Sequence, residues 1–245
     1  MKPEIAIIGY GRFGKLLAHY LKKDTQVFVS DKKKPKNVER GITVISLNEA
    51  ATKSVVVLAV PISVVPSILR FIAPLLQHGT LVCDVCSVKE QPITWMKDIL
   101  PKHASILGTH PLFGPDSIGK NLKNRTIVLC PVRIHSQQLS LIMGGLRKIG
   151  LNVIRMSPRQ HDEMMASTLF LTHIIGRGLH RLNLPPPDHT TQNYSNLKQI
   201  VETAGNDTVQ LFEDMYNYNR FAKHMLTNVM REFRKLSSTL NSHSA

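Results

Sequence analysis

The first two-thirds of the chain alternates short apolar runs with segments in which apolar residues recur every three or four positions. The runs are rich in Val and Ile, as buried parallel strands are, and the periodic segments are typical of helices packed on a sheet. Strands are expected at residues 4–8, 26–30, 42–45, 54–60, 80–84, 105–108, 126–129 and 152–154. Helices are expected at residues 16–21, 64–75, 93–100 and 137–149. This order predicts an α/β fold with a Rossmann-type doubly wound parallel sheet.

Strand signals stop after residue 156, and the remaining apolar residues follow the helical period. One long helix is expected from Pro158 to about Leu182, with Ser157 as its N-cap. Three consecutive prolines, 185–187, break the helical pattern after it. Two more helices and a frayed polar tail are then expected at residues 194–203, 208–236 and 237–245, respectively.

These patterns divide the chain into a dinucleotide-binding domain, residues 1–156, and an all-helical domain, residues 157–245. So short a helical block cannot bury all its apolar faces by itself. We therefore expect it to pack on the first domain or on a second copy of itself, as the dimerisation domain of a homodimer.

A glycine-rich turn, GYGRFG, lies at residues 9–14, directly after the first strand and before a helical segment. In this context Gly9 permits a tight turn, Gly11 lets a pyrophosphate approach the backbone, and Gly14 lets the helix pack closely on the strand. The free amides and positive dipole at the helix start then favour phosphate groups. The motif with both flanks predicts dinucleotide binding.

An acid ends the second strand, where it can accept hydrogen bonds from the adenosine ribose of NAD. This residue is Asp31, and the lysines 32–34 that follow could instead bind the 2′-phosphate of NADP. We expect NAD, with NADP as the alternative. The expected cofactor-binding residues are Gly9, Tyr10, Gly11, Arg12, Phe13, Gly14, Asp31, Val60, Pro61 and Ser87.

Two polar segments follow neighbouring apolar runs, DVCSVK at residues 84–89 and THPLFGP at 109–115. Both are interpreted as loops at the carboxyl ends of strands, where open α/β sheets bind ligands. His110 and Ser87 are the candidate reactive residues of these loops, although Ser87 could instead cap the following helix. This edge of the sheet is therefore the predicted active site.

A second candidate group lies on the long helix, where His173 and Arg177 are four residues apart and share one face. The forked donors of Arg177 suit a substrate carboxylate, but a surface arginine and a buried structural histidine are the alternatives. His161 and Asp162 open the same helix and are interpreted as structural.

The net charge of +14 is unevenly distributed, because residues 1–155 carry 22 Lys and Arg against 9 Asp and Glu, whereas residues 156–245 carry 9 against 8. This excess favours an anionic ligand, and a basic surface that aids solubility is the alternative. Cys83 and Cys86 have CxxC spacing, but strand alternation points them to opposite faces, so no metal or redox pair is expected. The N-terminal apolar run is too short for a signal or a membrane span, which predicts a soluble cytoplasmic protein.

Taken together, GxGxxG, DVxSVK, THPLFGP, HDxxMAxTxxLTHxIGR at residues 161–177 and ETAGND at 202–207 resemble the prephenate/arogenate dehydrogenase family of tyrosine biosynthesis. The resemblance covers nearly the whole chain and is greatest to the plant-type arogenate dehydrogenases. It implies a Rossmann domain, a helical dimerisation domain and NAD(P)-dependent oxidative decarboxylation of a cyclohexadienol.

By this resemblance His110 is the catalytic histidine, Ser87 hydrogen-bonds it, and His173 is a second active-site histidine. Glu202 stands where many bacterial members have a carboxylate-binding arginine, so another cation is needed. The substrate-binding residues expected are Arg177, Lys89 and Gly114.

Cys130 replaces an aspartate that is associated with arogenate in the plant-type enzymes. The resemblance therefore favours prephenate dehydrogenase, which gives 4-hydroxyphenylpyruvate, over arogenate dehydrogenase, which gives tyrosine directly.

Two other functions remain open. A non-catalytic protein that binds dinucleotides or nucleic acid needs the positive charge but not the histidines. A β-hydroxyacid dehydrogenase is expected to have a lysine on the long helix, and residues 158–182 contain none. We expect a small-molecule substrate, and no binding to nucleic acid or membranes.

Overall fold

The computed structural model describes residues 2–119, 121–183 and 189–242. The chain forms two compact units, Met1–His161 and Asp162–Ala245, so the division falls within a helix rather than before Ser157. The prolines 185–187 and the end of the polar tail lie outside the described residues. Among the helices that are described, none is long and apolar enough to cross a membrane.

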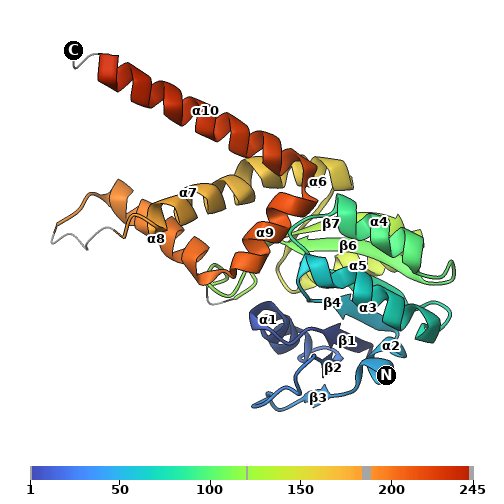
Figure 1. Ribbon diagram of the computed structural model, residues 1–245. Helices are drawn as coiled ribbons and strands as arrows, with labels where there is room; N and C mark the ends of the chain where they lie inside the picture. The colour runs from blue at the N-terminus through green and yellow to red at the C-terminus, as the bar shows by residue number, and fades with distance from the viewer. Residues whose placement is uncertain (1, 120, 184–188, 243–245) are drawn as a thin grey trace. The chain divides into compact units, whose positions relative to one another are not determined.

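The first unit contains a single sheet, shown in Figure 1, with the strand order β3-β2-β1-β4-β5-β6-β7-β8. Its strands are β1 (Glu4–Ile8), β2 (Gln26–Ser30), β3 (Ile42–Val44), β4 (Val55–Leu58), β5 (Leu81–Asp84), β6 (Ser105–Pro111), β7 (Thr126–Arg133) and β8 (Asn152–Arg155). The chain order reverses between β1 and β4, which is the position where such sheets bind nucleotides. The predicted Rossmann-type architecture is confirmed.

One pair of strands departs from the predicted parallel sheet, because β7 is antiparallel to β6. Among the described residues between Pro111 and Thr126, no helix carries the chain back across the sheet, and Pro111 is opposite Ile127 in the register. A parallel pair needs such a crossover, whereas an antiparallel pair does not. The β6 strand also extends to Pro111, so His110 lies in a strand and not in the expected loop.

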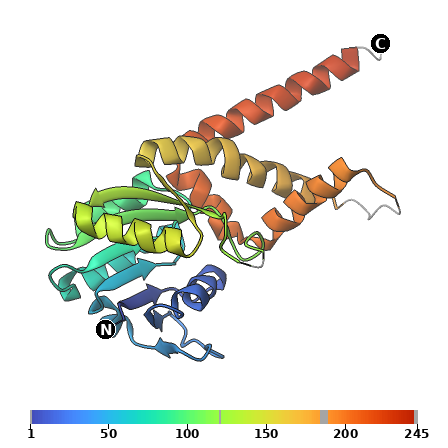
Figure 2. The same ribbon diagram turned by 180° about the vertical axis from the view of Figure 1, so that it is seen from behind.

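Helices cover both faces of this sheet (Figures 1 and 2). The helices α1 (Arg12–Leu21) and α5 (Ser136–Lys148) pack on one face in a shared apolar core, and α3 (Val65–Ile72) and α4 (Glu90–Ile99) pack together on the other. A short helix that the periodicity did not predict, α2 (Leu47–Ala51), begins at a capping box formed by Ser46 and Glu49. Short 3₁₀ segments, η1 (Ile62–Val64) and η2 (Ala73–Leu75), flank α3.

The second unit is helical, as predicted, but the long helix is interrupted. It comprises α6 (Pro158–Met165), a π-helical turn η3 (Ala166–Phe170) and α7 (Leu171–His180). Ser157 forms the predicted N-cap, since its Oγ accepts from Gln160 N at 3.2 Å. Single π turns inside helices occur frequently at functional sites. This turn immediately precedes the helix that carries His173.

The remaining helices are α8 (Gln192–Asn206), α9 (Val209–Tyr218) and α10 (Arg220–Ser242). The single helix expected at 208–236 is therefore wrong. Asn219 breaks it because its side chain is buried, donates to Asp162 O at 2.8 Å and accepts from Phe221 N at 3.0 Å. The last helix continues to Ser242, through most of the tail expected to fray. Phe170, Met215 and Ala222 form the centre of this unit's core.

Candidate active site

The glycine-rich turn has the shape that a dinucleotide requires. Gly9 has φ +103°, and a Cβ there would lie 2.3 Å from Ala59 O at the end of β4. A Cβ on Gly14 would lie 2.0 Å from Gly9 O, so both positions exclude a side chain. By contrast, a Cβ on Gly11 would meet nothing within 4 Å, and no side chain caps the first turn of α1. Open space above uncapped amides fits a pyrophosphate group.

The acid at the end of β2 lies against this turn. One carboxylate oxygen of Asp31 accepts from Tyr10 N at 2.6 Å, and the other accepts from Lys33 N at 3.3 Å. A carboxylate keeps further acceptor sites after such bonds, which fits the ribose hydroxyls of a dinucleotide. Val60 lies beside Gly9, where an added Cβ would be 3.0 Å from Val60 Cγ1, and Pro61 begins the next segment.

A buried ion pair joins the ends of β5 and β6. Lys89 is fully buried, and its Nζ bonds the carboxylate of Asp84 and donates to Thr109 O at 2.6 Å. Burying a charge is unfavourable unless it is paired in this way. Lys89 therefore positions the backbone next to His110. This structural use of its charge is the alternative to the predicted contact of Lys89 with the substrate carboxylate, which stays a prediction.

Ser87 lies in the loop that follows β5, and it is buried. Its Oγ has no hydrogen-bond partner among the described residues, so the expected bond to His110 is absent from this structure. Nor does Ser87 cap α4, whose N-cap is Lys89. A buried hydroxyl without a partner is unusual in proteins, and it is available to a ligand.

His110 is buried near the end of β6, and its Nδ1 lies within hydrogen-bond distance, 2.8 Å, of His161 Nε2. Burial lowers the pKa of His110 well below 6.5, and the electrostatic influence of the nearby His161 and Lys89 lowers it further. Such a histidine stays neutral at pH 7, so it can accept a hydrogen bond from a hydroxyl group. His161 had been interpreted as structural, because its sequence position at the start of a helix shows no link to a strand end.

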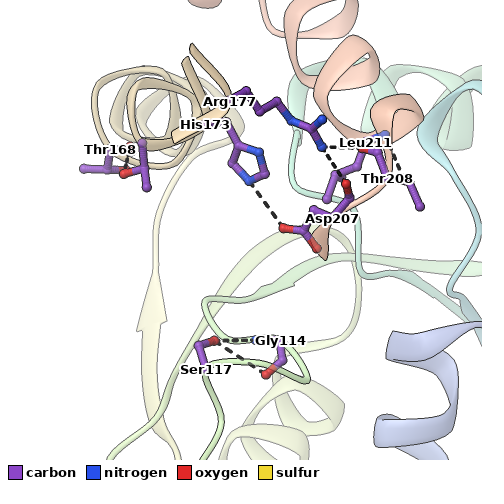
Figure 3. A network of polar contacts seen from close by, with 9 residues as sticks. Gly114, Ser117, Thr168, His173, Arg177, Asp207, Thr208 and Leu211 are labelled. Atoms are coloured by element: carbon purple, nitrogen blue, oxygen red, sulfur yellow. Dashed lines mark hydrogen bonds and ion pairs between the residues drawn. The ribbon is translucent and has the colours of Figure 1, made fainter. Parts of the chain in front are cut away.

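The loop after β6 folds back on the nucleotide turn within the same unit. Arg12 Nη2 and Asp116 Oδ1 are 2.6 Å apart. Gly114 closes a turn in this loop, because its N–H donates to Ser117 Oγ at 2.9 Å (Figure 3). Its carbonyl also accepts from Ile118 N at 2.9 Å. The expected substrate-binding Gly114 thus lies in a loop tied to the cofactor turn.

In the helical unit, the ends of α8 and α9 meet the face of α7 (Figure 3). His173 is buried, and its Nε2 lies 3.4 Å from Asp207 Oδ2. Arg177 donates through Nη2 to Asp207 O at 2.6 Å and Thr208 O at 2.9 Å, and its guanidinium lies 5.2 Å from the centre of the Phe212 ring. His173 Nδ1 and Arg177 Nε are buried without partners among the described residues.

The two carbonyls that Arg177 binds are uncharged, so they do not neutralise its positive charge. Glu202 lies on the exposed side of α8, 3.7 Å from Lys198, and does not take part. Asp207, which sequence reasoning did not single out, is part of the matched ETAGND segment. Only the fold shows that it reaches His173.

Cys130 lies in β7, fully buried and opposite Gly108 of β6. Its environment is the interior of the sheet, so this position gives no support for the inference that Cys130 selects the substrate. Burial also raises the pKa of the Cys83 thiol, which lies in β5, to about 12.

Comparisons with known proteins agree with this fold. The family model for the prephenate dehydrogenase nucleotide-binding domain matches residues 17–155, and the model for a TYRAAT1-like C-terminal domain matches residues 179–245. The crystal structure of prephenate dehydrogenase from Aquifex aeolicus, with hydroxyphenyl propionate and NAD+, superposes with a TM-score of 0.78 at 19% identity and covers 100% of this chain and 92% of that one. The crystal structure of Synechocystis arogenate dehydrogenase superposes with a TM-score of 0.67 at 19% identity and covers 98% of this chain and 93% of that one.

Curated relatives match over most of this chain. Arogenate dehydrogenase 1, chloroplastic, of Arabidopsis thaliana is 28% identical over 97% of this chain and 39% of its own length. A probable arogenate/prephenate dehydrogenase of Methanocaldococcus jannaschii is 30% identical over 95% of this chain and 56% of its own length. The chain thus spans less than two thirds of either relative. Because the family model matches more than half of its residues, the chain belongs to the prephenate/arogenate dehydrogenase family.

Proposed function

We propose that the protein catalyses the NAD-dependent oxidative decarboxylation of a cyclohexadienol, prephenate or arogenate. The observation that carries this proposal is His110, which is buried at the carboxyl edge of a nucleotide-binding sheet and has its pKa held below the ordinary value. A histidine held neutral can accept a hydrogen bond from the ring hydroxyl as the carbon that bears it becomes carbonyl-like. This type of catalysis contributes about 10²–10⁴-fold in rate.

The cofactor proposal rests on the glycine turn, the uncapped start of α1 and the carboxylate of Asp31. NAD, when bound, supplies a hydride acceptor at its nicotinamide ring. The acidic Asp31 favours NAD over NADP, because its negative charge repels a 2′-phosphate.

The substrate chemistry explains why orientation and charge control suffice. The ring loses a hydride from the carbon that bears the hydroxyl, and it loses CO2 from the opposite carbon. The electrons of the broken C–CO2 bond complete the aromatic ring, and aromatisation drives the reaction. The protein has to hold the two reacting groups in position. His110 and the unpartnered Ser87 are proposed for the hydroxyl end.

The two substrates differ in the side chain, which carries a keto group in prephenate and an ammonium group in arogenate. Cys130 is interior and no longer supports the prephenate assignment. The Asp207 carboxylate beside His173 favours a substrate with an ammonium group, because opposite charges attract. Arogenate is therefore a second candidate substrate, with Arg177 as the proposed cation for a substrate carboxylate.

The experiment crosses both substrates with NAD and NADP and follows absorbance of the reduced nicotinamide. We expect NADH formation with at least one substrate, and expect Asp207→Asn to raise the KM for arogenate more than the KM for prephenate. Failure of every combination to reduce the cofactor would contradict the proposed function. Equal changes of both KM values would contradict the role of Asp207 but not the reaction.

We also propose a homodimer formed through α10. Met230, Phe233, Leu236 and Leu240 lie on one side of this helix and expose 42–70% of their surface. The C-terminal half of α10 extends beyond the other helices of its unit (Figure 1). Light scattering of Phe233→Glu should show monomer where the unchanged chain is a dimer, and a monomeric unchanged chain would contradict this assembly.

A further inference from the structure

We propose that His161 is a positioning residue that holds the imidazole of His110 in one tautomer and one orientation. The inference rests on the proposed function, in which His110 accepts a hydrogen bond from the substrate. It assigns a task to a residue that the sequence placed only at the start of a helix.

The contact between these two histidines is direct and shielded from water. His110 Nδ1 and His161 Nε2 are 2.8 Å apart, and the two rings meet at an interplanar angle of 67° with centroids 5.0 Å apart. His161 is fully buried on α6, and His110 is 7% exposed on β6. Because a helix and a strand carry the two side chains, each ring is held by rigid backbone.

His161 also occupies the place that Ser87 was expected to fill. The hydroxyl of Ser87 has no partner among the described residues, and His110 makes no other side-chain hydrogen bond within them. The other charged groups at this position, Lys89 and Asp84, bond each other, and Lys89 bonds the carbonyl of Thr109 rather than the imidazole. His161 is therefore the group that can select the tautomer of His110.

The proton arrangement follows from the role proposed for His110. A neutral imidazole has one N–H donor and one acceptor nitrogen. If Nε2 of His110 accepts from the substrate hydroxyl, Nδ1 must carry the ring proton and donate a hydrogen bond to His161 Nε2. His161 Nε2 must then be an unprotonated acceptor, so His161 is neutral and carries its own proton on Nδ1. The hydrogen bond at one nitrogen of a histidine thereby sets the protonation of the other nitrogen.

Two substitutions separate hydrogen bonding from packing. His161→Leu fills a similar volume without an acceptor, whereas His161→Gln offers an amide oxygen. We expect His161→Leu to lower kcat by about 10–100-fold, the size of effect known for losing a partner that orients a metal-bound histidine, with little change in KM. His161→Gln should recover part of the lost kcat. Equal kcat values in His161→Leu and the unchanged chain would overturn the proposal.

Nitrogen NMR of the histidine rings tests the pairing without any measurement of activity. In the unchanged chain, the His110 signal, assigned by its loss in His110→Asn, should show protonated Nδ1 and unprotonated Nε2. In His161→Leu the proton should move toward Nε2, because the acceptor is gone. A proton on Nε2 of His110 in the unchanged chain would overturn the proposal, even if neither variant folds.

The two measurements also distinguish this inference from the proposed function. An inactive chain in which His110 has the expected tautomer would contradict the reaction but support the pairing. An active chain in which His161→Leu leaves both kcat and the tautomer unchanged would contradict the pairing but support the reaction.

Discussion

In the nucleotide-binding unit, charged and titratable groups near the sheet edge are buried and paired with one another, whereas in the helical unit a partly exposed arginine binds carbonyls where two helices meet. Lys89 is fully buried against Asp84, and His110 is buried against His161. Arg177, by contrast, is partly exposed and binds the carbonyls of Asp207 and Thr208. The same residue types therefore contribute to the two units through different physical effects.

The difference follows from how each unit is built. Lys89, just after β5, is fully buried, so its charge requires a partner of opposite sign. Helix ends leave carbonyls without intrahelical partners, and a cation on an adjacent helix can satisfy them while it stays near solvent. We expect a substitution in the sheet unit to lower turnover or the free energy of unfolding more than a substitution of the same type in the helical unit.

The largest effect is expected at His110. His110→Asn should lower turnover by about 10²–10⁴-fold, because the amide cannot replace a neutral imidazole as acceptor at the same place. Cofactor affinity, measured by NADH fluorescence, should be unchanged, since the glycine turn is intact. His78→Asn, at an exposed position of the same unit, is the control and should retain full turnover. Near-normal turnover in His110→Asn would remove His110 from the proposed mechanism.

The buried ion pair gives the next effect. Lys89→Met leaves the Asp84 carboxylate buried without its partner and should lower the free energy of unfolding by about 3–5 kcal/mol. Urea denaturation measures this change. The control is Lys97→Met, which removes an exposed lysine from α4 and should change the free energy of unfolding little. If the two variants had equal free energies of unfolding, the buried pair would not stabilise the sheet unit as this comparison requires.

A smaller effect is expected for the matched change in the helical unit. Arg177→Met removes the donor to two carbonyls and should lower the free energy of unfolding by about 1.5–3 kcal/mol, the usual contribution of hydrogen bonds from a charged group. The exposed Arg181, one turn later, provides the control as Arg181→Met. A loss as large as that of Lys89→Met would contradict the comparison between the units.

The smallest predicted effect depends on pH. Since the folded-state pKa of His110 is lowered, its stabilising contribution is fully present above about pH 6.5 and is lost as pH falls toward the lowered pKa. The unfolded chain then binds a proton that the folded chain excludes. Stability of the unchanged chain should therefore fall on acidification by up to about 1.4 kcal/mol per pH unit more than that of His110→Asn. Parallel unfolding curves for the two proteins at neutral and mildly acidic pH would contradict this assignment.

Several features of the candidate site could be predicted from the sequence because they depend on local order along the chain. The glycine turn can be predicted from the strand before it and the helix after it. Asp31 can be predicted from its position at the end of β2. His110 was found because it follows an apolar strand, although the strand extends through it. Its extension depends on pairing with β7, which the local sequence does not reveal.

Other features were missed because they join residues distant in the chain. His161 lies 51 positions from His110, and Arg177 lies 30 positions from the carbonyl of Asp207 that it binds. The helical period predicts on which face of its helix a side chain lies, but it does not predict which element packs against that face. Asn219 likewise breaks a helix because its buried side chain bonds the backbone of α6, and the period of that segment continues without interruption.

The sequence by itself determined the Rossmann-type sheet, the nucleotide turn and the identity of the histidine at the sheet edge, because apolar period and glycine spacing act over a few residues. The tertiary structure alone decided which groups meet: Lys89 with Asp84, His110 with His161, and His173 with Asp207. The physical reason is burial. Whether a lysine binds a substrate or an internal acid, and whether a histidine stays neutral, depends on the water and charge around it, and these are set by the folded chain.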